Sequence, residues 1–489
     1  MITKGKEKLL EGINQTVDVV KSTLGAKGKT VMISDPYGLG FTVTKDGVSV
    51  AKSIKFDDDL LALGSEFVKN AALKTVSEAG DNTTTTSILV QSMCNNIQKE
   101  INLGRDTNEL IEQLLNDKDS VLKFITSNSK KVSNIKDIKN IAKIASNNNE
   151  EIGSILEKVY SEAGWDVVID VVESDNNETT YEIVNGFTMR ETGYVSSQFI
   201  NNYEKGRVEF ENPKIYLYNG KIRQMTSDLM NIFQENADRN SETFRPLVLI
   251  VEDIEEAPLK EIMMAYRDGL IFSVAVVQSN LIFEDRKNTF IDASVFLDGE
   301  YQDTRIGKFG SCEKVIIDKD NITFINGSGD TKKHAERVKK NTKDKQRSFS
   351  LESIAAIIKV GGKLSSEISE KKDRIEDAVM SVRSAIEEGY LPGGGTTLIF
   401  ADKEEYGTVM RKALMSCYNQ LMINAEREPQ YFLRDIKDKG FGYGYNLVKD
   451  NVSNLYKDGI YDSAKALRVS IENAVHTATN FASINYIIH

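Results

Sequence analysis

Four consecutive threonines follow an acid and an amide in the segment "EAGDNTTTTSILV" (78–90). Threonine is a poor helix former because its branched β-carbon restricts χ1, yet the residues on both sides of this segment have helical patterns. A lone Asp or Thr at such a place most often caps a helix. The alternative is that free backbone N–H groups at a helix start, together with hydroxyls, bind a phosphate while Asp81 holds its metal.

Three glycine-rich segments are further candidates for phosphate contact: "STLGAKGKTV" (22–31), "LPGGGTTLI" (391–399) and "GFGYGYNLV" (440–448). Glycine lets the backbone approach a phosphate closely, and a lysine adds charge. Each segment alone is more often a turn at a helix end, and the chain has no GxxxxGK[ST] motif. Acids elsewhere in the chain add groups for Mg²⁺ and water without any histidine. These acids are Asp46, Asp81, Asp377 and Asp462.

The composition narrows the classes of function. The chain has 489 residues, of which 40% are hydrophobic and 28% charged, so it can bury the cores of about three domains. A net charge of −11 argues against nucleic acid as the main partner. Only three histidines and three cysteines occur, which argues against a His-based triad, a zinc hydrolase or a disulfide framework. We expect no signal peptide and no membrane span, and we predict a cytoplasmic protein.

The elements that would position these residues change in character along the chain. Residues 1 to about 127 have helical stripes, such as Leu9, Ile13 and Val17. Within them, "TVMISDPYGLGFTVTKDGVSVAKSI" (30–54) combines β-branched alternation with Asp-Pro and Lys-Asp-Gly turns, which indicates a hairpin. From about 186 to 355, short strands alternate with helical runs, and long helices then return. The simplest layout is a helical region split by an inserted α/β region.

Six motifs follow one another as in the group I chaperonins, the GroEL family: "TLGAKG", "TVTKDGVSVAKSI", "AGDNTTTTS", "EKKDRIEDAV", "EEGYLPGGG" and "GYGYN". The chain resembles this family from about residue 5 to 480. The resemblance implies a multidomain α/β fold of three parts. They are a mostly helical equatorial ATPase domain (1–127 and 388–489), a small intermediate hinge domain (128–185 and 356–387) and an inserted α/β apical domain that binds clients (186–355).

The resemblance also implies a site for ATP with Mg²⁺ and K⁺. Asp81 would hold Mg²⁺, and Asp46 and Asp377 would be catalytic. Asp377 projects from the polar side of its predicted helix, and hinge closure would swing it onto the site to orient the attacking water. Ala26 and Asn82 stand where the family usually has proline and glycine. The implied nucleotide-binding residues are Thr23, Leu24, Gly25, Ala26, Lys45, Asp81, Asn82, Thr83, Thr84, Thr85, Gly394, Asn446, Leu447, Val448 and Asp462.

Apolar stripes between 186 and 355 are usually core, but the resemblance implies that the matching helices bind apolar segments of non-native polypeptides. Methionine suits such unselective contact because it is flexible and polarisable. Gln198 replaces an aromatic residue of the family. The implied client-binding residues are Tyr194, Phe199, Leu229, Ile232, Leu259, Ile262, Met263 and Met264.

The family assembles into homo-oligomeric rings, so the resemblance implies a seven-membered ring, single or double. Asn419 replaces the family's inter-ring arginine, while Glu428 keeps the position of its partner. Bulky residues replace small ones nearby, at Leu103, Gln430 and Tyr431. Bulk at a close contact costs packing, and we predict a weakened inter-ring contact. At the apical hinge Ser353-Ile354 replaces a glycine pair, which leaves the extent of apical movement and the need for a co-chaperonin open.

The main interpretation is an ATP-driven folding chamber. One alternative is a ring that captures clients without a productive folding cycle. A third is a small-molecule kinase, for which no second substrate pocket is recognisable. Phosphate release in the absence of an acceptor separates the kinase from the other two. The Asn- and Lys-rich composition fits a bacteriophage or an AT-rich bacterium equally well.

Overall fold

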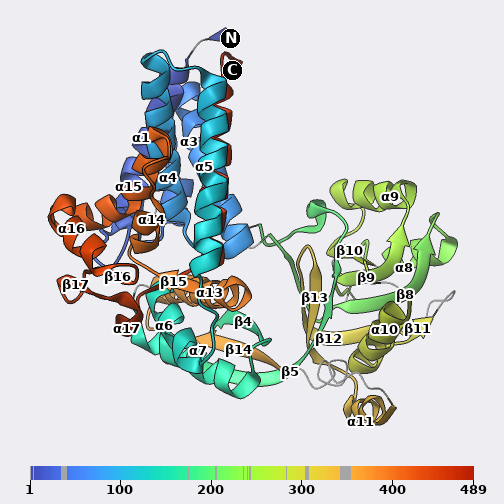
Figure 1. Ribbon diagram of the computed structural model, residues 1–489. Helices are drawn as coiled ribbons and strands as arrows, with labels where there is room; N and C mark the ends of the chain where they lie inside the picture. Colours follow the sequence, from blue (N-terminus) through green and yellow to red (C-terminus); the bar gives the residue numbers. More distant parts are fainter. Residues whose placement is uncertain are drawn as a thin grey trace. The chain divides into compact units, whose positions relative to one another are not determined.

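The computed structural model describes residues 2–488 except 4, 35–40, 147, 175, 204–205, 235, 239, 242–243, 282, 303–307 and 342–353. The chain forms two compact units (Figure 1). Unit 1 combines Met1–Glu162, Val171–Thr180 and Lys359–His489, and unit 2 combines Ala163–Asp170 and Tyr181–Ile358. Unit 2 is therefore inserted into unit 1, in agreement with the layout expected from the sequence. The finer division into three domains stays a prediction.

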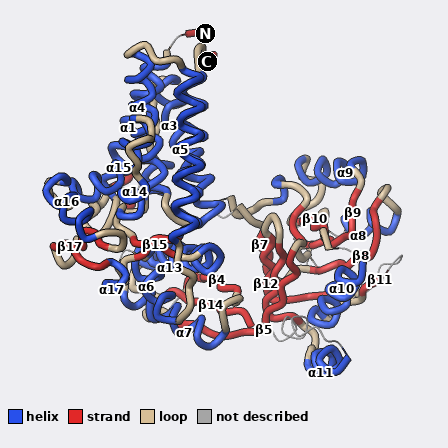
Figure 2. Tube along the Cα trace, in the orientation of Figure 1, coloured by secondary structure: helices blue, strands red, loops and turns tan. Residues whose placement is uncertain are grey.

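The N-terminal part of unit 1 is mainly helical (Figure 2). Leu9, Ile13 and Val17 form the buried stripe of the first helix, as their spacing predicts. Two later helices begin where an aspartate accepts hydrogen bonds from free N–H groups: Asp58 caps α3 and Asp106 caps α5. The helices are α1 (Lys6–Val20), η1 (Lys21–Thr23), α2 (Gly47–Ser53), α3 (Asp59–Ala79), α4 (Thr83–Asn102), α5 (Thr107–Asn128), α6 (Ile135–Ala145) and α7 (Glu150–Ala163).

The C-terminal part of the chain completes the same core. The last helix, α18, contacts α3, α4 and α5, and α15 contacts α4 and α5, so segments far apart in sequence lie side by side (Figure 1). Met93 of α4, Leu414 of α15 and Phe481 of α18 are fully buried in one cluster. The C-terminal helices are α13 (Ser365–Glu388), α14 (Thr396–Ala401), α15 (Thr408–Asn424), α16 (Pro429–Lys439), α17 (Leu455–Asp458) and α18 (Ala464–Ser483).

Four small antiparallel pairs complete unit 1. The predicted hairpin is present as β2 (Val31–Ser34) and β3 (Phe41–Thr44), whereas its Asp-Pro turn lies outside the described residues. The Lys-Asp-Gly segment was wrongly predicted as a turn of this hairpin, because it begins helix α2 instead. The other pairs are β1 (Ile2–Thr3) with β19 (Ile487–Ile488), β15 (Tyr390–Pro392) with β18 (Tyr461–Ser463), and β16 (Tyr443–Asn446) with β17 (Asn451–Asn454).

Unit 2 is an α/β structure built on one sheet. Its central strands are parallel, with β8 and β10 on either side of β9, and its other main pairings are antiparallel. The strand order is β5-β13-β12-β8-β9-β10-β6, with β7 beside β12 and β11 beside β8. The alternating strands and helices expected between 186 and 355 are therefore present.

The strands of this sheet are β5 (Thr180–Arg190), β6 (Thr192–Tyr194), β7 (Val208–Glu211), β8 (Lys214–Ile222), β9 (Leu247–Ile254), β10 (Val274–Ser279), β11 (Tyr301–Gln302), β12 (Gly310–Ile317) and β13 (Asn321–Gly327). Its helices are η2 (Ser197–Phe199), α8 (Ser227–Gln234), α9 (Glu256–Arg267), α10 (Phe283–Leu297) and α11 (Lys332–Asn341). The chain passes between the units four times: at the end of α7, within β4 (Val168–Glu173), at the start of β5 and within β14 (Ile354–Val360). None of the helices in the described part of the chain is long and apolar enough to span a membrane.

Candidate functional site

The threonine segment lies at the junction of α3 and α4. Helix α3 ends at Gly80, which has φ +73°, and α4 begins at Thr83 after Asn82, which has φ +70°. No side chain of the described residues caps the start of α4. The Asp81 carboxylate instead accepts from the N–H of Asn82, at 2.5 Å. An uncapped helix start with free N–H groups is a site for an anion such as phosphate.

The threonine hydroxyls divide into two groups. Thr86 is fully buried, and its hydroxyl bonds the Asn82 carbonyl at 3.0 Å and the Thr75 hydroxyl at 3.1 Å. Thr84 and Thr85 are only half-buried. The hydroxyl of Thr86 therefore secures the helix start, while those of the two residues before it are accessible to a ligand. The accessibility of Thr84 and Thr85 agrees with their choice as candidate ligands, whereas Thr83 is buried like Thr86.

Helix α2 approaches the start of α4 closely. A Cβ atom at Gly47 would lie 2.2 Å from the Thr84 hydroxyl oxygen, so only glycine permits this approach. Asp46 precedes this glycine and caps α2, with its two oxygens accepting from Val48 N–H at 3.1 Å and Ser49 N–H at 2.7 Å. The Asp46 side chain therefore has a structural role in α2 beside its expected catalytic one.

Helix α13 brings Asp377 to the same place. The Ser384 hydroxyl of α13 donates to the Ala79 carbonyl at 2.8 Å, and a Cβ at Gly80 would lie 2.1 Å from the Cβ of Met380. Burial and the charges of Asp46 and Asp81 raise the pKa of Asp377 well above its usual range. The sequence predicted that Asp377 reaches the site only on hinge closure. In this structure it already lies beside the other two acids.

A fourth acid comes from the C-terminal part of the chain. In the β15–β18 pair, Asp462 lies opposite Leu391, and a Cβ at Gly393 would lie 2.9 Å from the Asp462 carboxylate. Burial, followed by the charge of Asp81, raises the pKa of Asp462 to about 7. Burial and the charge of Asp46 likewise raise the pKa of Asp81 to about 6, against the effect of its hydrogen bond from the Asn82 N–H. The structure thus brings all four predicted acids together.

We call Asp46, Asp81, Asp377 and Asp462 the acid cluster. A bound cation reduces the repulsion between carboxylates that raise one another's pKa. In phosphate sites Mg²⁺ usually binds one or two carboxylates together with phosphate oxygens. Among the described residues, no group of three or more His, Cys, Asp or Glu side chains is arranged to hold a metal ion alone. The acid cluster therefore fits a Mg²⁺ ion that phosphates would hold in part, with Asp81 as a protein ligand.

Two glycine-rich loops are further candidates for contact with the nucleotide. Gly25 has φ +78°, and a Cβ there would lie 2.3 Å from Leu421 and 3.8 Å from Leu447. The hydroxyl of Thr23 donates to the Val20 carbonyl at 2.8 Å and is buried, so this residue offers a ligand its backbone rather than its side chain. Gly394 has φ +63°, and a Cβ there would find its nearest neighbours only at 4.0 Å. Backbone at the second loop is thus open to a ligand.

The loop predicted to surround the adenine and ribose is held by one amide. Asn446 is buried, and its Oδ1 accepts from the N–H groups of Val448 and Lys449, both at 3.0 Å. Its Nδ2 donates to Asp458 at 2.8 Å. The Asn446 side chain therefore holds its own loop, and its expected place beside the nucleotide stays a prediction. Leu447 is half-buried beside Gly25, and Val448 is exposed.

The sequence matches the model of the TCP-1/cpn60 chaperonin family over residues 17–489. The chain belongs to this family. It is also similar to crystal structures of the chaperonin gp146 from the bacteriophage EL 2 (Pseudomonas aeruginosa), determined in the presence of ATP-BeFx. Crystal form II has 20% identity and a TM-score of 0.67, and crystal form I has 21% identity and a TM-score of 0.62. Each match covers 100% of this chain and 99% of the other, and at these identities it shows the fold. The predicted family and the GroEL-like chaperonin fold are therefore confirmed.

The expected client-binding residues of this chaperonin fall into three groups in unit 2: buried, partly buried and exposed. Four of them are less than 9% exposed and belong to the core of the unit: Phe199, Leu229, Ile232 and Ile262. Their assignment to an exposed surface is corrected, because the helical stripes that they form pack on the sheet. Three others are partly buried against this core: Tyr194, Leu259 and Met263. Met264 is 50% exposed. Met230 of α8, which was not among the expected client-binding residues, is 45% exposed.

Several residues that shape the chaperonin site had no distinctive signal in the sequence. Gly47 follows Asp46 directly and was visible only as part of the supposed turn. Cys417 of α15 places its Sγ 3.9 Å from the Thr85 carbonyl. Asn424 hydrogen-bonds the backbone of the loop that contains Gly25. Gly47 acts on Thr84, and the other two act across hundreds of residues in sequence, so no local pattern could have identified any of the three.

Proposed function

We propose that this chaperonin binds ATP with Mg²⁺ and K⁺ and hydrolyses it to promote the folding of non-native polypeptides in a ring cavity. The observation that supports this proposal most directly is the acid cluster beside an uncapped helix start. An anionic ligand is favoured at the N–H groups of α4, and a cation is favoured at the acids a few residues away. A magnesium nucleotide supplies both charges.

Each part of the site has a proposed role. The N–H groups and hydroxyls of Thr83–Thr85 bind phosphate oxygens, and the backbone of Gly25 and Gly394 approaches the nucleotide. When bound, Mg²⁺ would neutralise phosphate charge, with Asp81 as its protein ligand. Asp377 in its ionised form accepts a hydrogen bond from the attacking water and orients it.

Phosphate release by the purified full chain tests this proposal. Asp377→Asn keeps the shape of the side chain and removes its charge, so ATP binding should stay near normal while hydrolysis falls. Glu387→Gln on the same helix is the matched control, because Glu387 lies at the surface, paired with Lys465. Equal turnover in Asp377→Asn and in the parent would refute the catalytic assignment. Phosphate release without any refolding of a client would favour the client-capturing ring.

We also propose a homo-oligomeric ring of seven subunits in the cytoplasm, with a weakened contact between rings. Two residues expected at that contact are among the most exposed large side chains of the described chain, with Leu103 at 79% and Tyr431 at 80%. Both side chains are therefore accessible to a neighbouring ring, and their bulk would hinder close packing there. For client contact, we propose the exposed Met264 and Met230 in place of the buried residues of the same helices.

A further inference from the structure

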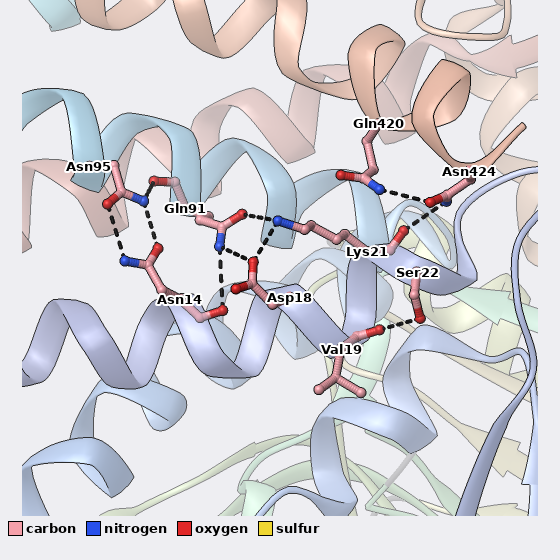
Figure 3. Close-up of polar contacts among 9 residues, drawn as sticks. All are labelled: Asn14, Asp18, Val19, Lys21, Ser22, Gln91, Asn95, Gln420 and Asn424. Carbon is pink, nitrogen blue, oxygen red and sulfur yellow. Dashed lines mark hydrogen bonds and ion pairs between the residues drawn. The ribbon is translucent and has the colours of Figure 1, made fainter. Parts of the chain in front are cut away.

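A polar groove lies between α1, α4 and α15 of unit 1. Its volume is about 510 Å³, and its walls carry amide and hydroxyl groups from all three helices. On one side, Lys21 at the start of η1 donates to Asp18 of α1 at 2.5 Å, and Gln91 of α4 donates to Asp18 at 2.9 Å (Figure 3). On the other side, Asn419 and Gln420 of α15 line the groove. This groove is separate from the acid cluster, none of whose members lines it.

Gln420 connects this groove to Asn424, one helical turn later on α15 (Figure 3). Asn424 is 8% exposed, and its Nδ2 donates to two backbone carbonyls, Lys21 O at 2.9 Å and Leu24 O at 3.0 Å. Two carbonyl acceptors require the NH₂ group on this side, which fixes the orientation of the amide. Its Oδ1 then faces Gln420 and accepts from the Nε2 at 2.7 Å.

The two carbonyls belong to the loop assigned to the nucleotide. Lys21 begins η1, and Leu24 directly precedes Gly25. Gly25 also packs on Leu421, the neighbour of Gln420 on α15. The loop is thus held to α15 by one amide with two donors and by one close packing contact. An amide that bonds two carbonyls three residues apart restricts where the following residues, Gly25 and Ala26, can lie.

We propose that Asn424 is a positioning residue for the nucleotide and that Gln420, from the groove, holds it in its working orientation. This inference rests on the proposed nucleotide site. The side chain of Gln420 is half-buried and bonds Asn424, so its effect on the nucleotide would pass through Asn424 without contact to the acid cluster.

We call the contacts from Gln420 through Asn424 to the loop the relay. Gln420→Ala tests this relay because it removes the donor to Asn424 and leaves the two bonds from Asn424 to the loop in place. Loss of one neutral hydrogen bond should weaken Mg-ADP binding about 3- to 10-fold, measured by titration calorimetry on the full chain. The rate of hydrolysis at saturating ATP should stay within about twofold, because the acid cluster is untouched. Gln420→Lys keeps a donor at this position and should restore binding.

Asn419→Ala is the matched control. It removes an amide from the same groove and helix, and its buried Oδ1 has no hydrogen-bond partner. Hydrogen exchange without nucleotide gives a second measurement, in which the amides of residues 24–29 should exchange faster in Gln420→Ala than in Asn419→Ala. Unchanged Mg-ADP affinity in Gln420→Ala, or an equal loss in Asn419→Ala, would overturn the relay. If the parent chain itself bound no Mg-ADP, the proposed nucleotide site would be wrong and the relay with it.

Discussion

Asp462 should lower the stability of the nucleotide-free protein at neutral and alkaline pH. Its pKa is raised from 3.8 to about 7, so the folded state binds its proton more tightly than the unfolded state does. The contribution of Asp462 to the free energy of unfolding is therefore fully present below about pH 4 and is lost as the pH rises through about 7. Keeping the ionised carboxylate in the fold at pH 8 costs at most about 4 kcal/mol, at about 1.4 kcal/mol per pH unit.

Asp462→Asn removes this cost. Allowing for partial contact with solvent, we expect the variant to be about 2 to 4 kcal/mol more stable than the parent at pH 8 and equally stable near pH 4. Mg-ADP should stabilise the parent more than the variant, because bound Mg²⁺ offsets the repulsion in the acid cluster. The measurement is the thermal melting temperature at pH 4 and pH 8, with EDTA and with Mg-ADP, at one protein concentration.

Asp458→Asn is the control for this experiment. Although burial raises the pKa of Asp458, hydrogen bonds from Lys449, Ser453 and Asn446 lower it below its usual value. The same substitution four residues earlier should therefore destabilise the protein at pH 8. A lower melting temperature for Asp462→Asn than for the parent at pH 8 without nucleotide would refute the reasoning, since the carboxylate would then be stabilising.

Further predictions follow from the same geometry. Asp377→Asn should reduce hydrolysis on the order of 10²-fold with near-normal binding of Mg-ATP, as measured by phosphate release and calorimetry. Asp81→Asn should instead weaken binding of the magnesium nucleotide, and unchanged affinity would exclude it as a metal ligand. Leu229→Ser should cost about 2–5 kcal/mol because this side chain is buried, whereas Met264→Ser should leave the melting temperature unchanged and reduce capture of an unfolded client. Sedimentation velocity in apo, ADP and ATP conditions should show single rings in at least one state, and double rings in all three would contradict the weakened contact expected around Leu103.

Local sequence patterns predicted several helices and strands of this molecule and the types of residue at its site. The stripe of α1, the hairpin of β2 and β3 and the helix start after Asp81 all follow from spacing and capping preferences. The Lys-Asp-Gly segment was misassigned because the same three residues suit a hairpin turn and a helix start. What decides between them is the approach of α2 to Thr84, a tertiary contact that no local window contains.

The remaining failures have a similar cause. An amphipathic helix in unit 2 has the same periodicity whether its apolar face meets the sheet or a client, so Leu229 and Met230 were distinguishable only by packing. The position of Asp377 depends on how α13 packs on Gly80, and the function of Asn424 depends on a loop some 400 residues earlier in the chain. Periodicity assigns a face to a helix, but it does not identify what that face contacts.

The pairing of the two chain ends has a consequence for how this protein is made. Ile2 pairs with Ile488, and Lys6 donates to the Ala482 carbonyl at 2.7 Å, so unit 1 joins residues that are synthesised far apart in time. Unit 2 consists mainly of one continuous segment, and it can fold while translation continues. The apolar faces of α3, α4 and α5 are covered only after α15 and α18 have been synthesised, and contacts of such long range form slowly. During that interval the nascent chain exposes the kind of apolar surface that it is proposed to capture in other proteins.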